Sequence, residues 1–170
     1  VIYLSTFSKL LAPGLRLAWV IAPPEVTRKL VMTKQAADLH TSSFNQYVAY
    51  EVGKGGFLDE HVKVIRATYK ERRDVMLEMM EEMFPAGVTW RKPQGGMFLW
   101  GILPEGMDAA DVLKCAIEKK VAFVPGQAFH PNGGGKNTMR INFSYSAPDT
   151  IREGVTRLGT TLKELIAGKG

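Results

Sequence analysis

One lysine stands among small hydroxyl residues directly after an apolar segment near the start of the chain. Lys9 follows Thr6 and Ser8, and Arg16 comes seven residues later, after the turn signal Pro13-Gly14. Hydroxyl groups and a planar guanidinium can hold phosphate oxygens through charge-assisted hydrogen bonds. An uncharged lysine amine can condense with an aldehyde. These residue types therefore suit a ligand that carries both a phosphate and an aldehyde.

The same pattern also has an ordinary interpretation. A hydroxyl-rich turn with one lysine is usually a solvated loop. The segment also lacks the Gly-x-x-x-x-Gly-Lys-Ser/Thr spacing of a nucleotide-binding loop. Spacing alone leaves both interpretations open and does not identify a ligand.

Two apolar segments flank this loop and predict the strands that would position it. Residues 1–5 are typical of a short strand. Residues 17–22 form a continuous apolar run, which predicts a second strand buried on both faces. Helices are expected over residues 25–38 and 41–54. The loop over residues 6–16 therefore connects two strands.

A long amphipathic segment follows. Apolar residues recur at steps of mostly three and four from Leu58 to Met83, which predicts one helix over residues 57–84. The sequence beyond it predicts shorter elements: strands over residues 88–92, 97–103, 121–124 and 139–143, a helix over 109–120 capped by Asp108, and a terminal helix capped by Ser146.

This order of elements predicts an α/β chain in three parts. Residues 1–56 would be the end of a large α/β domain, residues 57–84 a connecting helix, and residues 85–170 a small C-terminal α+β domain. The chain opens with Val1 inside an apolar strand, so we expect it to be the C-terminal part of a longer protein.

The charge and residue composition bear on which classes of partner and which compartment we expect for the protein. The net charge is +5, from 22 basic and 17 acidic residues that are interleaved, so we predict no nucleic-acid partner. No apolar run reaches roughly 18 residues and no signal peptide is recognisable, so no membrane partner is expected. The single cysteine, Cys115, suits a reducing compartment, and we predict a cytoplasmic location. The three histidines show no metal-ligand spacing, and no metal is expected.

The segment over residues 5–19 resembles the lysine signature of fold-type I aminotransferases of the class I/II family. That signature has Ser-x-Ser-Lys, then a Pro-Gly-Leu-Arg turn and a Gly-Trp-like strand. Here Thr6 stands for the first serine and Ala18 for the glycine. Both departures are mild. Thr6 keeps the hydroxyl group of the serine that it replaces.

Three later segments resemble motifs of the same family, in the expected order. They are Pro-Gln-Gly-Gly-Met-Phe-Leu-Trp at residues 93–100, Val-Pro-Gly-Gln-Ala-Phe at 124–129 and Met-Arg-Ile-Asn-Phe-Ser at 139–144. The four motifs cover nearly the whole chain. Their sequences are most similar to those of the 2-aminoadipate, kynurenine and broad-specificity aromatic aminotransferase branch.

The resemblance implies a cofactor and a set of site residues. Lys9 would form a Schiff base with pyridoxal 5'-phosphate, whose phosphate would be bound by Thr6, Ser8 and Arg16. Residues 1–56 would then be the end of the large cofactor-binding domain. Arg140 would grip the substrate α-carboxylate, although an arginine opening an apolar strand often serves a surface ion pair.

The implied reaction moves an amino group between an amino acid and a 2-oxo acid, with Lys9 as general base and acid. The family is homodimeric, and it supplies further cofactor contacts from the large domain that have no counterpart in this sequence. We therefore expect residues 1–170 alone to turn over little or nothing.

Two rival functions stay open. Some transcription regulators carry an aminotransferase-like domain that binds pyridoxal phosphate as a sensor behind a helix-turn-helix domain. A lyase or decarboxylase would use the same cofactor for a different reaction. The amino-donor specificity does not follow from this sequence.

Overall fold

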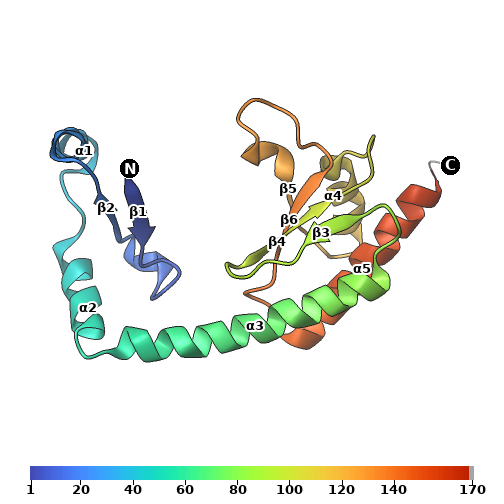
Figure 1. Ribbon diagram of the computed structural model, residues 1–170, viewed down its shortest axis with the longest axis horizontal. Helices are drawn as coiled ribbons and strands as arrows, with labels where there is room; N and C mark the ends of the chain where they lie inside the picture. Colours follow the sequence, from blue (N-terminus) through green and yellow to red (C-terminus); the bar gives the residue numbers. More distant parts are fainter. Residues whose placement is uncertain (169–170) are drawn as a thin grey trace. The chain divides into compact units, whose positions relative to one another are not determined.

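The computed structural model describes residues 1–168. The chain divides into two compact units, residues 1–66 and residues 67–170. The division falls within α3 (Phe57–Met83), which runs as one continuous helix (Figure 1). The predicted helix over residues 57–84 is thus confirmed, whereas the predicted domain limits stay a prediction.

The first unit is built on one strand pair and two helices. Strands β1 (Tyr3–Thr6) and β2 (Ala18–Ile21) are antiparallel, and the register places Thr6 opposite Ala18. A short 3-10 turn, η1 (Pro13–Leu15), lies in the loop between them. Helices α1 (Pro24–Asp38) and α2 (Ser43–Gly53) follow.

Local signals explain where α2 begins and ends. The Ser42 hydroxyl accepts a hydrogen bond from the Asn45 N–H, which satisfies one of the free donors at the helix start. The helix ends at Gly53, at the head of the glycine-rich stretch that separates it from α3.

The apolar surface of this first unit is largely exposed. Leu17 and Ala49 are its buried hydrophobic residues in the described chain, while Val20 is 41% and Ile21 64% exposed. The expectation that the second strand is buried on both faces is therefore wrong within residues 1–168. A two-stranded sheet has two faces, and the described residues of this unit do not cover them.

The second unit carries a complete antiparallel sheet in the order β3-β4-β6-β5. Its strands are β3 (Thr89–Arg91), β4 (Phe98–Ile102), β5 (Val124–Pro125) and β6 (Thr138–Asn142). The part of α3 after residue 66 and two further helices, α4 (Ala109–Glu118) and α5 (Pro148–Ala167), complete it.

One face of this sheet forms the core. Alternate residues of β4 and β6 are buried, among them Leu99, Met139 and Ile141. They pack in one cluster with residues of α3, α4 and α5, including Met80, Val112, Leu158 and Leu162. Gly159 lets α5 approach α3 closely, because a Cβ there would lie 2.7 Å from the Met83 carbonyl oxygen.

Two details differ from the sequence predictions. The predicted strand over residues 121–124 is wrong: β5 pairs only Val124 and Pro125 with β6, and Phe123 is buried outside any strand. An apolar run reports burial, which a coil segment can also provide. Ser146 is not the cap of the last helix, because α5 starts at Pro148 with Ala147 as N-cap and no side-chain cap bond. Proline needs no N–H partner at a helix start.

None of the helices formed by residues 1–168 is long and apolar enough to cross a membrane.

Candidate active site

The loop that carries Lys9 is closed at its base by the strand pair. The Phe7 N–H donates to the Leu17 carbonyl over 3.1 Å, and the Thr6 hydroxyl donates to the same oxygen over 3.0 Å. The Phe7 ring packs against Trp19 with 4.9 Å between ring centroids. The ladder therefore brings residues 6–8 beside the end of the loop that contains Arg16.

The two predicted hydroxyl residues lie together. The Thr6 and Ser8 side-chain oxygens are 2.9 Å apart, and the Ser8 N–H donates to the Thr6 oxygen over 3.1 Å. Because a carbonyl oxygen only accepts, the single Thr6 proton is used on Leu17. Thr6 thus braces the loop, and its hydroxyl would donate to a ligand only after releasing that carbonyl.

Arg16 adopts a left-handed backbone conformation, with φ of 53° and ψ of 39°. This conformation is uncommon for a residue with a side chain and often occurs where structure serves a site. The Arg16 N–H and its Nη1 both donate to the Pro13 carbonyl, over 3.3 Å and 3.0 Å. The guanidinium is exposed and has five N–H donors in all, so most remain available for an anion.

Lys9 lies between these residues, on a turn in which the Leu10 and Leu11 N–H groups donate to the Phe7 carbonyl. Its side chain is exposed, and no hydrogen bond or ion pair holds it in the described chain. Residues 5–17 contain two cations and no acidic residue. The loop therefore fits a phosphate group and leaves one amine free to react with an aldehyde.

Asn45 is a loop contact that sequence reasoning missed. Its side-chain amide donates to the Leu15 carbonyl over 3.1 Å, so α2 holds the turn just before Arg16. An asparagine in the first turn of a helix gives no signal for this contact, because its partner lies 30 residues away.

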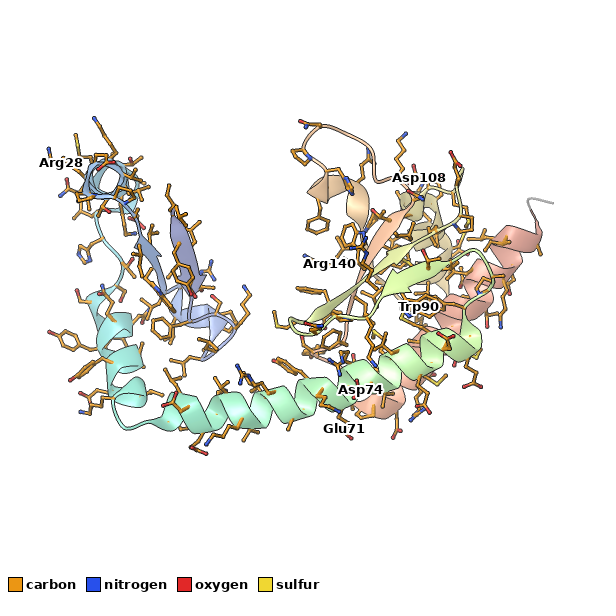
Figure 2. The ribbon with its side chains drawn as sticks, in the orientation of Figure 1. Arg28, Glu71, Asp74, Trp90, Asp108 and Arg140 are labelled. Atoms are coloured by element: carbon orange, nitrogen blue, oxygen red, sulfur yellow. The ribbon has the colours of Figure 1, made fainter. Side chains whose placement is uncertain are left out.

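Arg140 belongs to the second unit and lies at the middle of β6 (Figure 2). It pairs with Trp100 of β4 and Val124 of β5, on the face of the sheet opposite the core. Its guanidinium carbon lies over two rings, 4.2 Å from the centroid of Phe98 and 4.7 Å from that of Phe129.

The Arg140 Nε atom is buried without a hydrogen-bond partner. In the described chain no carboxylate pairs with this guanidinium, so the surface ion pair that sequence reasoning left open does not form. A buried unpaired donor costs about 1–3 kcal/mol, and each ring contact offsets roughly 0.5–2 kcal/mol. An arginine in this state suits an anionic ligand.

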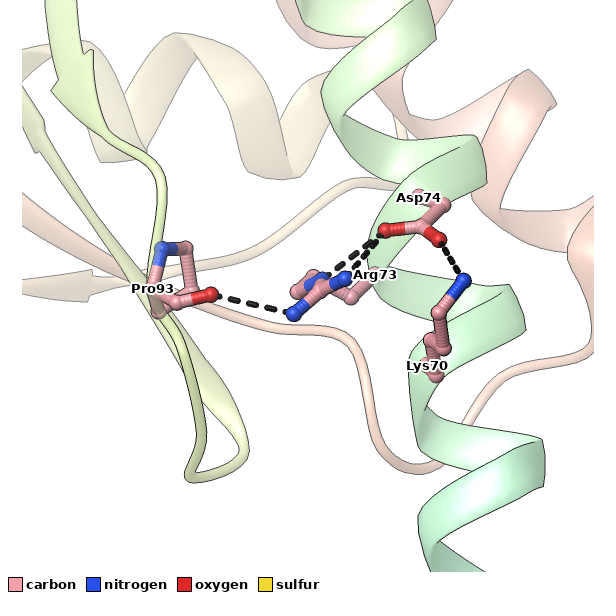
Figure 3. A network of polar contacts seen from close by, with 4 residues as sticks. All are labelled: Lys70, Arg73, Asp74 and Pro93. Carbon is pink, nitrogen blue, oxygen red and sulfur yellow. Dashed lines mark hydrogen bonds and ion pairs between the residues drawn. The ribbon is translucent and has the colours of Figure 1, made fainter.

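A polar network on α3 holds the segment that leads to Phe98 (Figure 3). Arg73 Nη1 donates to the Pro93 carbonyl over 3.1 Å. Arg73 Nη2 and Lys70 Nζ both bind the Asp74 carboxylate, over 2.6 Å and 2.9 Å. These hydrogen bonds, from Lys70 first and then Arg73, lower the pKa of Asp74 from its ordinary value.

The neighbouring Arg72 donates to the Ser144 carbonyl, just after β6. Two consecutive arginines of α3 therefore hold the chain on both sides of the β4–β6 pair. Sequence reasoning missed both, because basic residues within a charged helix read as a solvated face.

The described residues bring the predicted site residues into two groups. Thr6, Ser8, Lys9 and Arg16 share one loop of the first unit, and Arg140 lies on the sheet of the second. The described part of the chain contains no group of three or more metal-ligating side chains that could hold a metal ion.

Comparison with known proteins places these features in a family. The family model described as aminotransferase class I and II matches residues 1–158. Aromatic-amino-acid aminotransferase 1 of Thermococcus litoralis is 52% identical over 96% of this chain, which spans 39% of that protein.

Solved structures of aminotransferases also match this chain. LysN, the alpha-aminoadipate aminotransferase of Thermus thermophilus, complexed with N-(5'-phosphopyridoxyl)-L-leucine, matches with a TM-score of 0.94 and 46% identity. The match covers 98% of this chain and 43% of LysN. Kynurenine aminotransferase of Pyrococcus horikoshii matches with a TM-score of 0.93 and 51% identity, over 98% of this chain and 41% of that one.

The relatives also include helix-turn-helix transcriptional regulators, at 27% to 30% identity. The α/β fold is that of the aminotransferase structures, and the chain spans about two fifths of the length of the relatives it matches. The family model covers most of the sequence, and this chain belongs to the class I and II aminotransferase family.

Proposed function

We propose that the whole protein containing this chain is a pyridoxal-phosphate-dependent aminotransferase, in which Lys9 carries the cofactor. The observation that carries this proposal is the closed loop over residues 6–16, which gathers one free amine, the hydroxyls of Thr6 and Ser8 and one guanidinium without any acidic residue. The family match and the phosphopyridoxyl ligand of LysN support the same cofactor.

Each residue of the loop has a separate task. Ser8 and Arg16 hold the phosphate, by a hydroxyl and by charge-assisted hydrogen bonds. Thr6 keeps the loop closed through Leu17 and adds a phosphate contact when it releases that carbonyl. Lys9 Nζ would hold the cofactor through its amine, and the same nitrogen would move the proton taken from the substrate Cα.

Arg140 binds the substrate α-carboxylate. A guanidinium presents parallel N–H donors that match the two carboxylate oxygens, which fixes the direction of the Cα–H bond. The bound cofactor supplies an electron sink for the charge that develops at Cα. An amino acid and a 2-oxo acid are then the two substrates, used in turn.

We further propose that the whole protein is a cytoplasmic homodimer, as the resemblance implies. The names of the relatives supply a first panel of amino donors: aromatic amino acids, 2-aminoadipate and kynurenine.

Borohydride reduction of the whole protein with pyridoxal phosphate, followed by peptide mapping, tests the linkage. The adduct is expected on Lys9, and turnover of Lys9→Ala is expected to fall by a factor on the order of 10³ or more. Lys163→Ala, at an exposed position on α5, is the matched control and should keep both adduct and turnover. An adduct that persists on the Lys9→Ala protein would refute the proposal.

The second candidate is a cofactor-binding sensor domain of a transcription regulator, favoured by the matches to helix-turn-helix regulators over almost the whole chain. A sensor would form the Lys9 adduct without converting an amino acid. Product analysis with the donor panel separates the two, and it also separates transamination from lyase or decarboxylase chemistry.

A further inference from the structure

Two motifs of the sequence, at residues 93–100 and 124–129, each carry a phenylalanine that contacts the same side chain. Phe98 closes the segment that begins at Pro93, and Phe129 closes the turn η2 (Gly126–Phe129) after Pro125. They stand 31 residues apart in the chain, and the guanidinium carbon of Arg140 lies over both rings.

We propose that Phe98 and Phe129 form an aromatic clamp, a pair of positioning residues that hold the Arg140 guanidinium ready for a carboxylate. The clamp rests on the proposed function, because it assigns to Arg140 the substrate carboxylate as ligand. Both rings contact the Arg140 guanidinium. Both act through the orientation of Arg140.

The chemistry of the rings explains why aromatic residues suit this place. The N–H donors of a guanidinium point outward in its plane, whereas an aromatic ring attracts the cation from above that plane. The rings therefore stabilise the charge without using a donor. An aspartate partner would occupy the same N–H groups that a substrate carboxylate needs.

Charge around Arg140 supports this assignment. The buried Nε has no partner, and no carboxylate pairs with the guanidinium in the described residues. In the described residues, the two rings are the groups that lie against this charge. Two ring contacts and the absence of a paired carboxylate among the described residues suit an arginine that binds a carboxylate.

Phe129 is held over Arg140 by the close fit of its turn. The Trp100 ring meets Phe129 edge-on with 5.6 Å between centroids. A Cβ at Gly126 would lie 1.9 Å from Thr138 Oγ1 and 2.9 Å from the Trp100 ring. Only glycine lets the turn lie this close to the sheet. Gly126 therefore determines how near the turn that carries Phe129 lies to the sheet.

Phe98 is held from the other side by the network on α3. The Phe143 N–H donates to the Met97 carbonyl over 3.2 Å, which fixes the start of β4 against the end of β6. Arg73 holds Pro93 and Arg72 holds Ser144, so one helix anchors both segments. These backbone contacts and the Trp100 ring therefore fix the segments from which the two phenylalanines project.

The test compares Phe98→Leu and Phe129→Leu with Phe84→Leu in the whole protein. Phe84 is buried and packs edge-on against Trp90, so its replacement removes an aromatic contact from the same unit without touching Arg140. Steady-state kinetics give KM and kcat for an amino acid. A titration with propionate, a carboxylate without an amino group, gives a dissociation constant that does not depend on turnover.

Each clamp variant should raise KM and the propionate dissociation constant by about 3- to 30-fold, as expected for one lost cation–π contact. The kcat should change much less, and Phe129→Tyr, which keeps a ring, should restore binding. Phe84→Leu should lower the melting temperature without changing either constant. A merely structural role would not produce this split.

The Arg140 Nε–H signal in a ¹⁵N NMR spectrum of the whole protein without cofactor gives a readout that needs neither cofactor nor activity. Ring currents should shift it, and Phe129→Leu should move it toward the position of an ordinary arginine. A protein that binds propionate as expected but does not transaminate would refute the proposed function and leave the clamp supported. Unchanged propionate binding in both clamp variants, or an equal loss in Phe84→Leu, would overturn the clamp.

Discussion

The two units of this chain differ in how completely they bury their apolar residues. In the described part of residues 1–66, Leu17 and Ala49 are the buried hydrophobic residues, and a hollow of about 740 Å³ lies between the strand pair and α2, lined by Phe7 and Tyr50 among others. The second unit closes one cluster of methionine, leucine, valine and phenylalanine side chains between its sheet and three helices.

The proposed reactive residue Lys9 therefore lies in the unit that buries less apolar surface. The loop with Lys9 is held by hydrogen bonds to Leu17 and Leu15, but its strands expose apolar faces. Arg140 instead projects from a sheet whose other face is packed. Burial of apolar surface is the main force that stabilises a fold, so the second unit should be the stable one.

The largest expected effect is seen when the units are separated. Residues 67–170 alone should unfold in one cooperative thermal transition, because the whole core cluster lies within them. Residues 1–66 alone should show weak helicity and no cooperative transition by circular dichroism. A cooperative transition of residues 1–66, at the same temperature as that of residues 67–170, would contradict the expectation that the second unit is the more stable one.

Two leucine-to-alanine substitutions, one in each unit, test the same difference in burial at single positions. Leu162 is fully buried on α5, so Leu162→Ala should lower the free energy of unfolding by about 2–5 kcal/mol. Leu4 is 70% exposed on β1, so Leu4→Ala should change it by less than about 0.5 kcal/mol in the 170-residue chain.

Urea unfolding curves measure both variants. The same Leu4→Ala change in the whole protein should cost more, since we expect the apolar face of β1 to be covered there. Equal effects of Leu4→Ala in the chain and in the whole protein would contradict that expectation.

An effect smaller than that of Leu162→Ala concerns Asp74 and depends on pH. Its pKa is lowered by hydrogen bonds from Lys70 and Arg73, so the folded state binds a proton there less readily than the unfolded chain. The resulting stability is present above the ordinary value near 3.8 and is lost as pH falls below it. Because the carboxylate is 40% exposed, solvent screening keeps the contribution below about 1 kcal/mol.

Chemical denaturation of the chain and of Asp74→Asn between pH 7 and pH 3 measures this contribution. The two unfolding free energies should differ at pH 7 and converge toward pH 3. A difference that stays constant over this range would show that the carboxylate charge is not responsible. High salt should shrink the difference at pH 7.

Local patterns predicted the elements that depend on neighbouring residues. The stepwise apolar residues from Leu58 to Met83 became α3, and Asp108 caps α4 by accepting from the Ala110 N–H. Patterns failed where local and distant interactions compete. Val121 and Phe123 pack against the core without joining a strand, and Pro148 starts α5 without the help of Ser146.

The family, the lysine loop with its hydroxyls and arginine, and the long amphipathic helix could be predicted from the sequence alone, because each depends on residues close together in the chain. Only the tertiary structure decided that Phe98, Phe129 and Arg140 meet, that Asn45 braces the lysine loop, and that the second strand lies exposed in the described chain. These outcomes depend on packing between segments that lie far apart in the chain, and no pattern of neighbouring residue types encodes such packing.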